Sequence, residues 1–164
     1  MGRRSKDELA IELRKLSAAV DACYRVLEKI EPGAGWTDLD EGTLDWFNRL
    51  IETRKATMSE CIGGARDALN DVAPRGSRYP SEAEREARFL RLFEEETGES
   101  FWAICPKPSA QLKIVRTRGR IVDETEARLV QDRLSDVGEK SGPGAKERSQ
   151  LEAILGSFEN EKRE

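Results

Sequence analysis

The sequence predicts a mainly α-helical protein, with a long antiparallel helical hairpin of the coiled-coil type as its largest part. Apolar residues recur at alternating spacings of four and three over two long stretches, which is the pattern of packed helices. Charged residues make up 37% of the 164 residues, and so charged a composition favours elongated helices over a compact sphere. Additional helices and a small β-hairpin or extended arm complete the predicted fold.

The first predicted helix covers residues 6–31. Ser5 and Glu8 have the spacing of a capping box, in which each side chain accepts a hydrogen bond from the backbone N–H of the other residue. A Pro-Gly pair follows the end of the helix. At 1.5 Å per residue, this helix is roughly 39 Å long. Its apolar positions are Leu9, Leu13, Leu16, Val20, Cys23, Leu27 and Ile30.

The second predicted helix starts at Thr43 as its N-cap and continues to residue 73. An eleven-residue loop, 32–42, joins the two helices, so we expect them to fold back on each other. In that register Arg54 lies opposite Asp21. The Gly63-Gly64 pair costs about 1 kcal/mol per glycine in a helix, and we expect it to mark a close approach of the two helix backbones.

The rest of the chain divides into shorter segments. A second capping box, Ser81 with Glu84, predicts a third helix that ends near Gly98. The prolines and β-branched residues of 100–122 favour a β-hairpin or extended arm. The predicted organisation is therefore a hairpin at 1–73, a linker at 74–80, a smaller helical part at 81–137 with the arm at 100–122, a flexible linker at 138–145 and a C-terminal amphipathic helix at 146–164.

The composition excludes several classes of function. The chain has no histidine, which removes Ser-His-Asp and Cys-His hydrolysis, His-ligated zinc and Glu-x-x-His di-iron sites. Its three cysteines, at 23, 61 and 105, lack redox or zinc spacing, and we expect reduced thiols in a cytoplasmic protein. The acidic loop 38–42 does not fit an EF-hand. We therefore expect no catalytic residues, metal or cofactor.

The first thirty residues do not resemble a cleaved secretion signal. The longest stretch without a charged residue, Ser100–Pro106, has seven residues. About twenty apolar residues are needed to cross a bilayer as a helix. We therefore expect no membrane partner.

Positive charge is concentrated in the predicted arm. Between Ser100 and Val122 there are five positive residues and no acidic residue. Arginines on an extended arm can follow a phosphate backbone, and an aromatic ring can stack on unpaired bases. The alternative is that the arginines line a solvent face or pair with Glu94–Glu96. The candidate nucleic-acid-binding residues are Lys107, Lys113, Arg116, Arg118, Arg120 and Trp102.

Apolar residues in two other places are candidates for binding a partner protein. Trp36 and Trp46 flank the acidic loop, where they either pack the hairpin tip or form an exposed anchor. The C-terminal helix follows a flexible linker, and it either docks on its own chain or enters a groove of a partner. Its candidate contact residues are Leu151, Ile154, Leu155 and Phe158.

These features favour a binding function. The leading hypothesis is a non-enzymatic helical subunit or adaptor of a larger assembly, which can include nucleic acid, with a protein or a second copy of this chain as the partner. One alternative is direct binding of single-stranded or structured nucleic acid through 107–120. A second alternative is a protein inhibitor, of the kind phages encode, that acts by surface binding.

Overall fold

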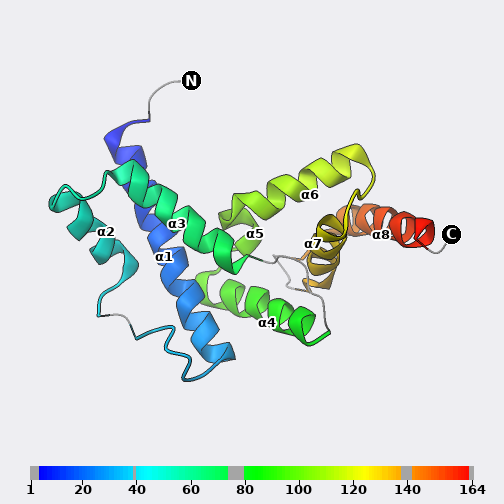
Figure 1. Cartoon of the computed structure of the whole chain (residues 1–164), viewed down its shortest axis with the longest axis horizontal. Helices are drawn as coiled ribbons and strands as arrows, with labels where there is room; N and C mark the ends of the chain where they lie inside the picture. The colour runs from blue at the N-terminus through cyan, green and yellow to red at the C-terminus, as the bar shows by residue number, and fades with distance from the viewer. Residues whose placement is uncertain (1–3, 39, 74–79, 138–141, 163–164) are drawn as a thin grey trace. The chain divides into compact units, whose positions relative to one another are not determined.

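The protein is mainly α-helical, which confirms the predicted class. The computed structural model describes residues 4–38, 40–73, 80–137 and 142–162, and all regular structure in these ranges is helical (Figure 1). The chain divides into two compact units, unit 1 with residues 1–72 and unit 2 with residues 73–164. The predicted linker at 74–80 lies outside the described residues except for its last residue, and the predicted linker at 138–145 does so in its first half. No described helix is long and apolar enough to span a membrane.

Unit 1 begins with α1 (Lys6–Ile30), and its first turn confirms the predicted capping box. The Glu8 N–H donates to the Ser5 hydroxyl at 3.2 Å, and the Ser5 N–H donates to the Glu8 carboxylate at 2.7 Å. The Ser5 backbone N–H, and to a smaller extent the Ser5 side chain, lower the pKa of Glu8, because they stabilise its charged carboxylate. The central positions of the predicted apolar pattern are buried: Leu13, Leu16, Val20, Cys23 and Leu27.

The prediction of one continuous helix over 43–73 is wrong. The segment forms two helices, α2 (Thr43–Glu52) and α3 (Met58–Val72). Arg54 adopts a left-handed conformation with φ of 56°, and the N–H groups of Lys55 and Ala56 both donate to the carbonyl of Leu50. A left-handed residue after the C-cap is a common way to end a helix, although glycine is usual there.

A second capping box starts α3. The Thr57 N–H donates to the Glu60 carboxylate at 2.7 Å, and the Glu60 N–H donates to the Thr57 hydroxyl at 3.3 Å. The bonds from Thr57 lower the pKa of Glu60. The stabilisation that this capping box contributes is therefore fully present above the usual titration range of a glutamate. It is lost as the pH falls through the lowered pKa of Glu60.

The break changes the direction of the helix that packs on α1. The chain reverses after α1 and again after α2, so α3 runs in the same general direction as α1 (Figure 1). Glu12 pairs with Arg66, and Tyr24, further along α1, lies near Asp71, further along α3. The predicted antiparallel pairing of two long helices is therefore wrong, and the described residues of unit 1 form the three helices α1, α2 and α3.

The carboxylate of Asp21 caps the start of α2. It accepts hydrogen bonds from the Thr43 N–H at 3.0 Å and from the Thr43 hydroxyl at 2.5 Å. The predicted pairing of Asp21 with Arg54 is wrong, since Arg54 lies in the loop at the opposite end of α2. Gly42, and not Thr43, is the N-cap residue. Because Gly42 has no side chain, the missing cap comes from α1.

The predicted close approach of helix backbones at Gly63 and Gly64 is also wrong. A Cβ on Gly63 meets nothing within 4 Å, and one on Gly64 meets only the ring of Phe47 at 3.8 Å. Both glycines lie inside α3, where alanine is favoured by about 1 kcal/mol. We therefore expect Gly63→Ala to raise the free energy of unfolding by up to about 1 kcal/mol, measured by urea denaturation. A lower urea midpoint would contradict the open space at Gly63.

Unit 2 begins with α4 (Pro80–Thr97), which Gly98 ends in a left-handed conformation, as predicted. The helix begins one residue before the predicted Ser81 cap. Its inner face carries Phe89 and Phe93, and both rings pack edge-on against Phe101 of the short helix α5 (Phe101–Ile104) at centroid distances of 5.3 and 5.1 Å. These three buried aromatic rings form a large part of the unit 2 core.

The predicted β-hairpin or arm at 100–122 is wrong. The segment forms α5 and α6 (Pro106–Arg118), and Gly119 ends α6 with φ of 74°. Pro106 is the first residue of α6, where a missing N–H costs nothing because the first turn has no internal acceptor. Leu112 and Val115 face the core at helical spacing, whereas the β-branched Ile114 between them is 58% exposed.

The last two helices are α7 (Glu124–Ser135) and α8 (Ala145–Glu161). The carboxylate of Asp123 caps α7 by accepting from the Glu126 N–H at 2.8 Å. The C-terminal helix α8 packs on α7 and α6. Leu151 and Ile154 of α8 are buried. Of the two placements that the sequence allowed for this helix, the structure has it docked on its own chain.

Candidate functional site

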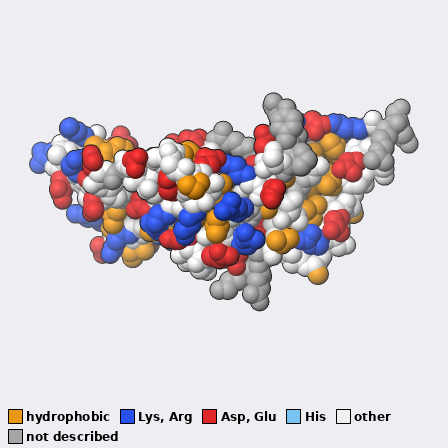
Figure 2. Space-filling model, turned by 90° about the horizontal axis from the view of Figure 1, so that it is seen from below, with side chains coloured by type: hydrophobic (Ala, Val, Ile, Leu, Met, Phe, Trp, Pro, Cys, Tyr) orange, Lys and Arg blue, Asp and Glu red, His pale blue; other side chains and the backbone are white. Residues whose placement is uncertain are grey.

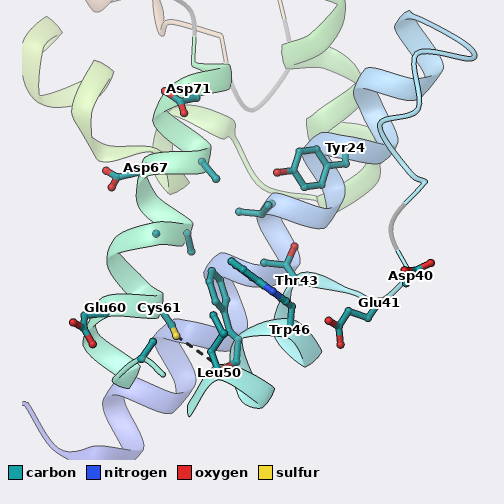
Figure 3. Close-up of a pocket in the computed structure, with 16 residues that line it drawn as sticks. Tyr24, Asp40, Glu41, Thr43, Trp46, Leu50, Glu60, Cys61, Asp67 and Asp71 are labelled. Atoms are coloured by element: carbon teal, nitrogen blue, oxygen red, sulfur yellow. Dashed lines mark hydrogen bonds between the residues drawn. The ribbon is translucent and has the colours of Figure 1, made fainter. Parts of the chain in front are cut away.

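An apolar depression in the described part of unit 1 lies between α1, α2 and α3 (Figure 3). Its volume is about 710 Å³. We call it the unit 1 groove. It is lined by Val20 and Tyr24 of α1, by Asp40, Glu41, Thr43, Trp46, Phe47 and Leu50 of α2 and the loop before it, and by Ala56, Glu60, Cys61, Gly64, Ala65, Asp67, Ala68 and Asp71 of α3 and its approach.

The floor of the groove is apolar and contains an exposed tryptophan. Trp46 is 45% exposed, whereas the neighbouring Phe47 is 5% exposed. The two rings lie 5.0 Å apart between centroids. Figure 3 shows Trp46 in the middle of the groove, between α3 and the loop that precedes α2. The opposite wall presents small residues of α3, Gly64, Ala65 and Ala68, which leave the indole face accessible.

Acidic side chains stand on both sides of the apolar floor. Glu60, Asp67 and Asp71 follow one side of α3, and Asp40 and Glu41 lie on the loop across the groove (Figure 3). None of the described residues that line the groove is a lysine or arginine. The groove therefore combines apolar contact area with a negative border.

Two titratable groups on the floor are held in their neutral forms. Burial, with a smaller contribution from the nearby charge of Glu60, raises the pKa of Cys61. Burial also raises the pKa of Tyr24, and neighbouring negative charges add to this effect. In unit 2, burial raises the pKa of Cys105 to about 11. At neutral pH the thiols of Cys61 and Cys105 are therefore protonated, which makes them poor nucleophiles.

Trp36, the other tryptophan predicted near the hairpin tip, holds the loop after α1. Its ring stacks on Tyr24 with 6.5 Å between centroids. Its backbone N–H donates to Glu28 at 3.0 Å, and its indole N–H donates to Glu31 at 3.3 Å. Of the two tryptophans, Trp46 is the one that lines the groove.

The basic residues predicted at 107–120 lie on α6 and just after it. Two of them carry carboxylate partners: Arg118 pairs with Glu126, and Arg116 lies 3.7 Å from Glu147. The sequence suggested Glu94–Glu96 as acidic partners, but these pairs are made with α7 and α8. Lys107, Lys113 and Arg120 are exposed.

Trp102 is part of a buried polar network in unit 2. It is 6% exposed, and its indole N–H donates to Asp136 at 2.9 Å. The guanidinium of Arg133 lies 5.3 Å from the Trp102 ring centroid and makes two hydrogen bonds to Glu147, at 3.2 and 3.0 Å. In this structure the protein covers the indole, so Trp102 does not offer a face to a nucleic-acid base.

The face of the molecule that Figure 2 presents carries charges of both signs. Figure 2 shows basic and acidic side chains interspersed over the face it presents, with hydrophobic side chains between them. Charges of both signs in close alternation give a weaker long-range field than a uniform basic patch. This pattern favours local contacts over general attraction of nucleic acid.

No family model, curated protein or solved structure matches this chain. Its candidate site therefore rests on the geometry described above. Within the described ranges, no group of three or more acidic or cysteine side chains is arranged to hold a metal ion.

The candidate residues of α8 divide into two pairs. Leu151 and Ile154 are buried at 0% and 6% exposure. Leu155 and Phe158 are half-buried, and the Lys162 ammonium lies 5.0 Å from the centroid of the Phe158 ring. The helix thus uses its most apolar residues within its own unit and leaves only a narrow strip at the surface.

The sequence indicated Trp46 but not the other walls of the groove. One available signal was the spacing of Glu60, Gly64, Asp67 and Asp71, which places acidic and small residues on one face of a helix. A second was the Thr57-x-x-Glu60 capping box, which marks the start of α3. The contribution of Tyr24 depends on the direction in which α3 crosses α1, and no local pattern reports that direction.

Proposed function

We propose that this protein is a non-enzymatic helical adaptor that binds a partner protein in the unit 1 groove. The observation that carries the proposal is Trp46, an indole with 45% of its surface exposed on the floor of an apolar groove. Tryptophan is enriched among the residues that contribute most to protein–protein binding.

The shape of the groove also favours a protein partner over a small metabolite. Sites for small molecules have a few polar groups that converge on the ligand. Here the hydroxyl of Thr43 already donates to Asp21, and the carboxylates stand along the borders of the groove. A partner that inserts apolar anchors fits this distribution, because the interface then has an apolar centre and a polar border.

Direct nucleic-acid binding is the less favoured function. Arg116 and Arg118 have carboxylate partners, and Trp102 is buried. Lys107, Lys113 and Arg120 remain as exposed cations of that set. An inhibitor would use the same groove as an adaptor, and the two differ in whether the bound partner keeps its activity.

The test compares the same substitution at two adjacent positions of the full chain. Gly64→Met extends a long side chain into the groove, whereas Gly63→Met lies outside the groove lining and meets open space. Both changes replace a helical glycine with a better helix former. Peptides selected from a displayed library on the wild-type chain are then measured by fluorescence anisotropy.

We expect Gly64→Met to weaken these peptides by about tenfold or more, since overfilling a packed contact costs about 1–3 kcal/mol. Gly63→Met is expected to leave their affinity unchanged. Circular dichroism and urea denaturation verify that both variants fold. Equal affinity of the selected peptides for both variants would contradict a site in the groove.

A further inference from the structure

We infer that the segment bound in the unit 1 groove is a basic amphipathic helix of the partner protein. This inference rests on the proposed function and specifies the chemistry of the partner. Its apolar side chains would contact Trp46 and the small residues of α3. Its lysines and arginines would face the carboxylates on the two borders.

The negative charge along the groove favours a partner segment of positive charge. The acidic lining residues come from two separate elements, with Glu60, Asp67 and Asp71 on α3 and Asp40 and Glu41 on the facing loop. Glu41 pairs with Arg49, which lies outside the lining. The described lining residues themselves include no lysine or arginine. An acidic partner would meet repulsion from both borders, and complementary charge is the main source of specificity at such a surface.

The spacing of the acidic residues matches a helical ligand. Glu60 and Asp71 are separated by about 16 Å along the axis of α3, the length of about three helical turns. A helix of that length presents apolar anchors at positions i, i+3, i+4 and i+7 on one side and cations on the flanks. The small side chains at Gly64 and Ala68 allow the ligand to approach α3 closely.

The secondary structure disfavours the main alternative for a peptide ligand. An extended peptide gains affinity by adding a strand to an exposed sheet edge. All regular structure in the described ranges is helical, so the groove offers no strand edge. A helical peptide satisfies its own backbone hydrogen bonds and needs only side-chain contacts.

The probes are three designed peptides of about 18 residues that share one leucine- and phenylalanine-containing face. The first carries lysine on its remaining positions, the second glutamine, and the third glutamate. Each is labelled with fluorescein and titrated with the full-length protein at about 50 and about 300 mM NaCl, which spans weak to strong screening. Circular dichroism compares the helicity of the free and bound peptides.

The protein variants distinguish the loss of negative charge at the borders of the groove from the loss of the same amount of charge elsewhere on unit 1. Asp40→Asn with Asp67→Asn removes two charges from opposite borders of the groove. The matched control, Asp7→Asn with Glu52→Gln, removes two charges from exposed residues of unit 1 outside the lining. We expect the border pair to weaken the lysine peptide by about fivefold at low salt, and the control pair by less than about twofold.

The lysine peptide is expected to bind more tightly than the glutamine peptide and to become more helical when bound. Its advantage should decrease at high salt, and Gly64→Met should remove its binding.

Equal affinity for the lysine and glutamine peptides, or tighter binding of the glutamate peptide, overturns the inference. If Gly64→Met abolishes the binding of those peptides, the proposed function still holds, because the groove is then a protein-binding site for a partner of different charge. Lysine-peptide binding that Gly64→Met leaves intact overturns both the inference and the proposed function.

Discussion

Arg133→Met is expected to lower the free energy of unfolding by about 3–5 kcal/mol, the cost of breaking a buried ion pair on one side. Arg133 makes two hydrogen bonds to Glu147 and lies 3.6 Å from Asp136. Its side chain is 11% exposed, and that of Asp136 is 1% exposed. Methionine fills a similar volume against Trp102 but leaves the two carboxylates without this cation. Urea denaturation followed by circular dichroism measures the effect.

The control for this change is Arg91→Met in the same unit. Arg91 is 58% exposed and pairs with Glu95 one turn away at 3.9 Å, a type of pair that contributes about 0.3–0.5 kcal/mol. A double-mutant cycle with Glu147→Gln then measures the coupling of Arg133 to Glu147. A loss below about 1 kcal/mol for Arg133→Met would mean that the network contributes no more than a surface pair.

Phe93→Ala is expected to destabilise the protein by about 3–5 kcal/mol, the range for removing a buried aromatic ring. Phe93 is fully buried. It stacks on Phe89 at 6.1 Å and meets Phe101 edge-on at 5.1 Å. The substitution removes both ring contacts and leaves a cavity between α4 and α5. The measurement is again the urea unfolding curve.

Phe158→Ala is the comparison for Phe93→Ala, because Phe158 is half-buried and its ring contacts the exposed Lys162. We expect a loss of about 1 kcal/mol or less, since much of the ring surface is already in water. Phe93→Leu should recover much of the stability lost in Phe93→Ala, because it restores most of the apolar volume. Similar losses for Phe93→Ala and Phe158→Ala would contradict the placement of Phe93 in the core.

The sequence predicted the elements whose ends carry strong local signals. The start of α1 follows from the Ser5 and Glu8 side chains, and the end of α4 from Gly98. The break between α2 and α3 was missed because Arg54 occupies a left-handed conformation that glycine usually signals. The apolar pattern continues through the break, since α2 and α3 both bury one face.

The arm at 100–122 was mispredicted for a different reason. Proline near the start of a helix and proline in a loop give the same local signal, and β-branched residues favour strands only on average. At Leu112 and Val115, burial at helical spacing outweighed that preference. The same limit applies to the basic residues. Glu126, which pairs with Arg118 only 8 residues away along the chain, and Glu147 become partners because α7 and α8 pack on α6, and the sequence pattern does not report that packing.

The candidate groove was predictable only in part. Trp46 stood out as a large aromatic residue beside an acidic loop. The role of Gly64 and the α3 carboxylates depends on the reversal at Arg54, which brings α3 back along α1. A one-helix interpretation of 43–73 places Asp71 opposite the start of α1, whereas in the structure Asp71 lies near Tyr24.

That reversal also makes the groove depend on contacts of very different reach along the chain. The contact of Cys61 with Phe47 joins residues 14 apart and that of Thr43 with Asp21 joins residues 22 apart, whereas the contact of Arg66 with Glu12 joins residues 54 apart. Closing the longest of these loops costs about 1 kcal/mol more chain entropy than closing the shortest. The lining of the groove is complete only when α1 contacts both other helices, because Val20 and Tyr24 belong to α1.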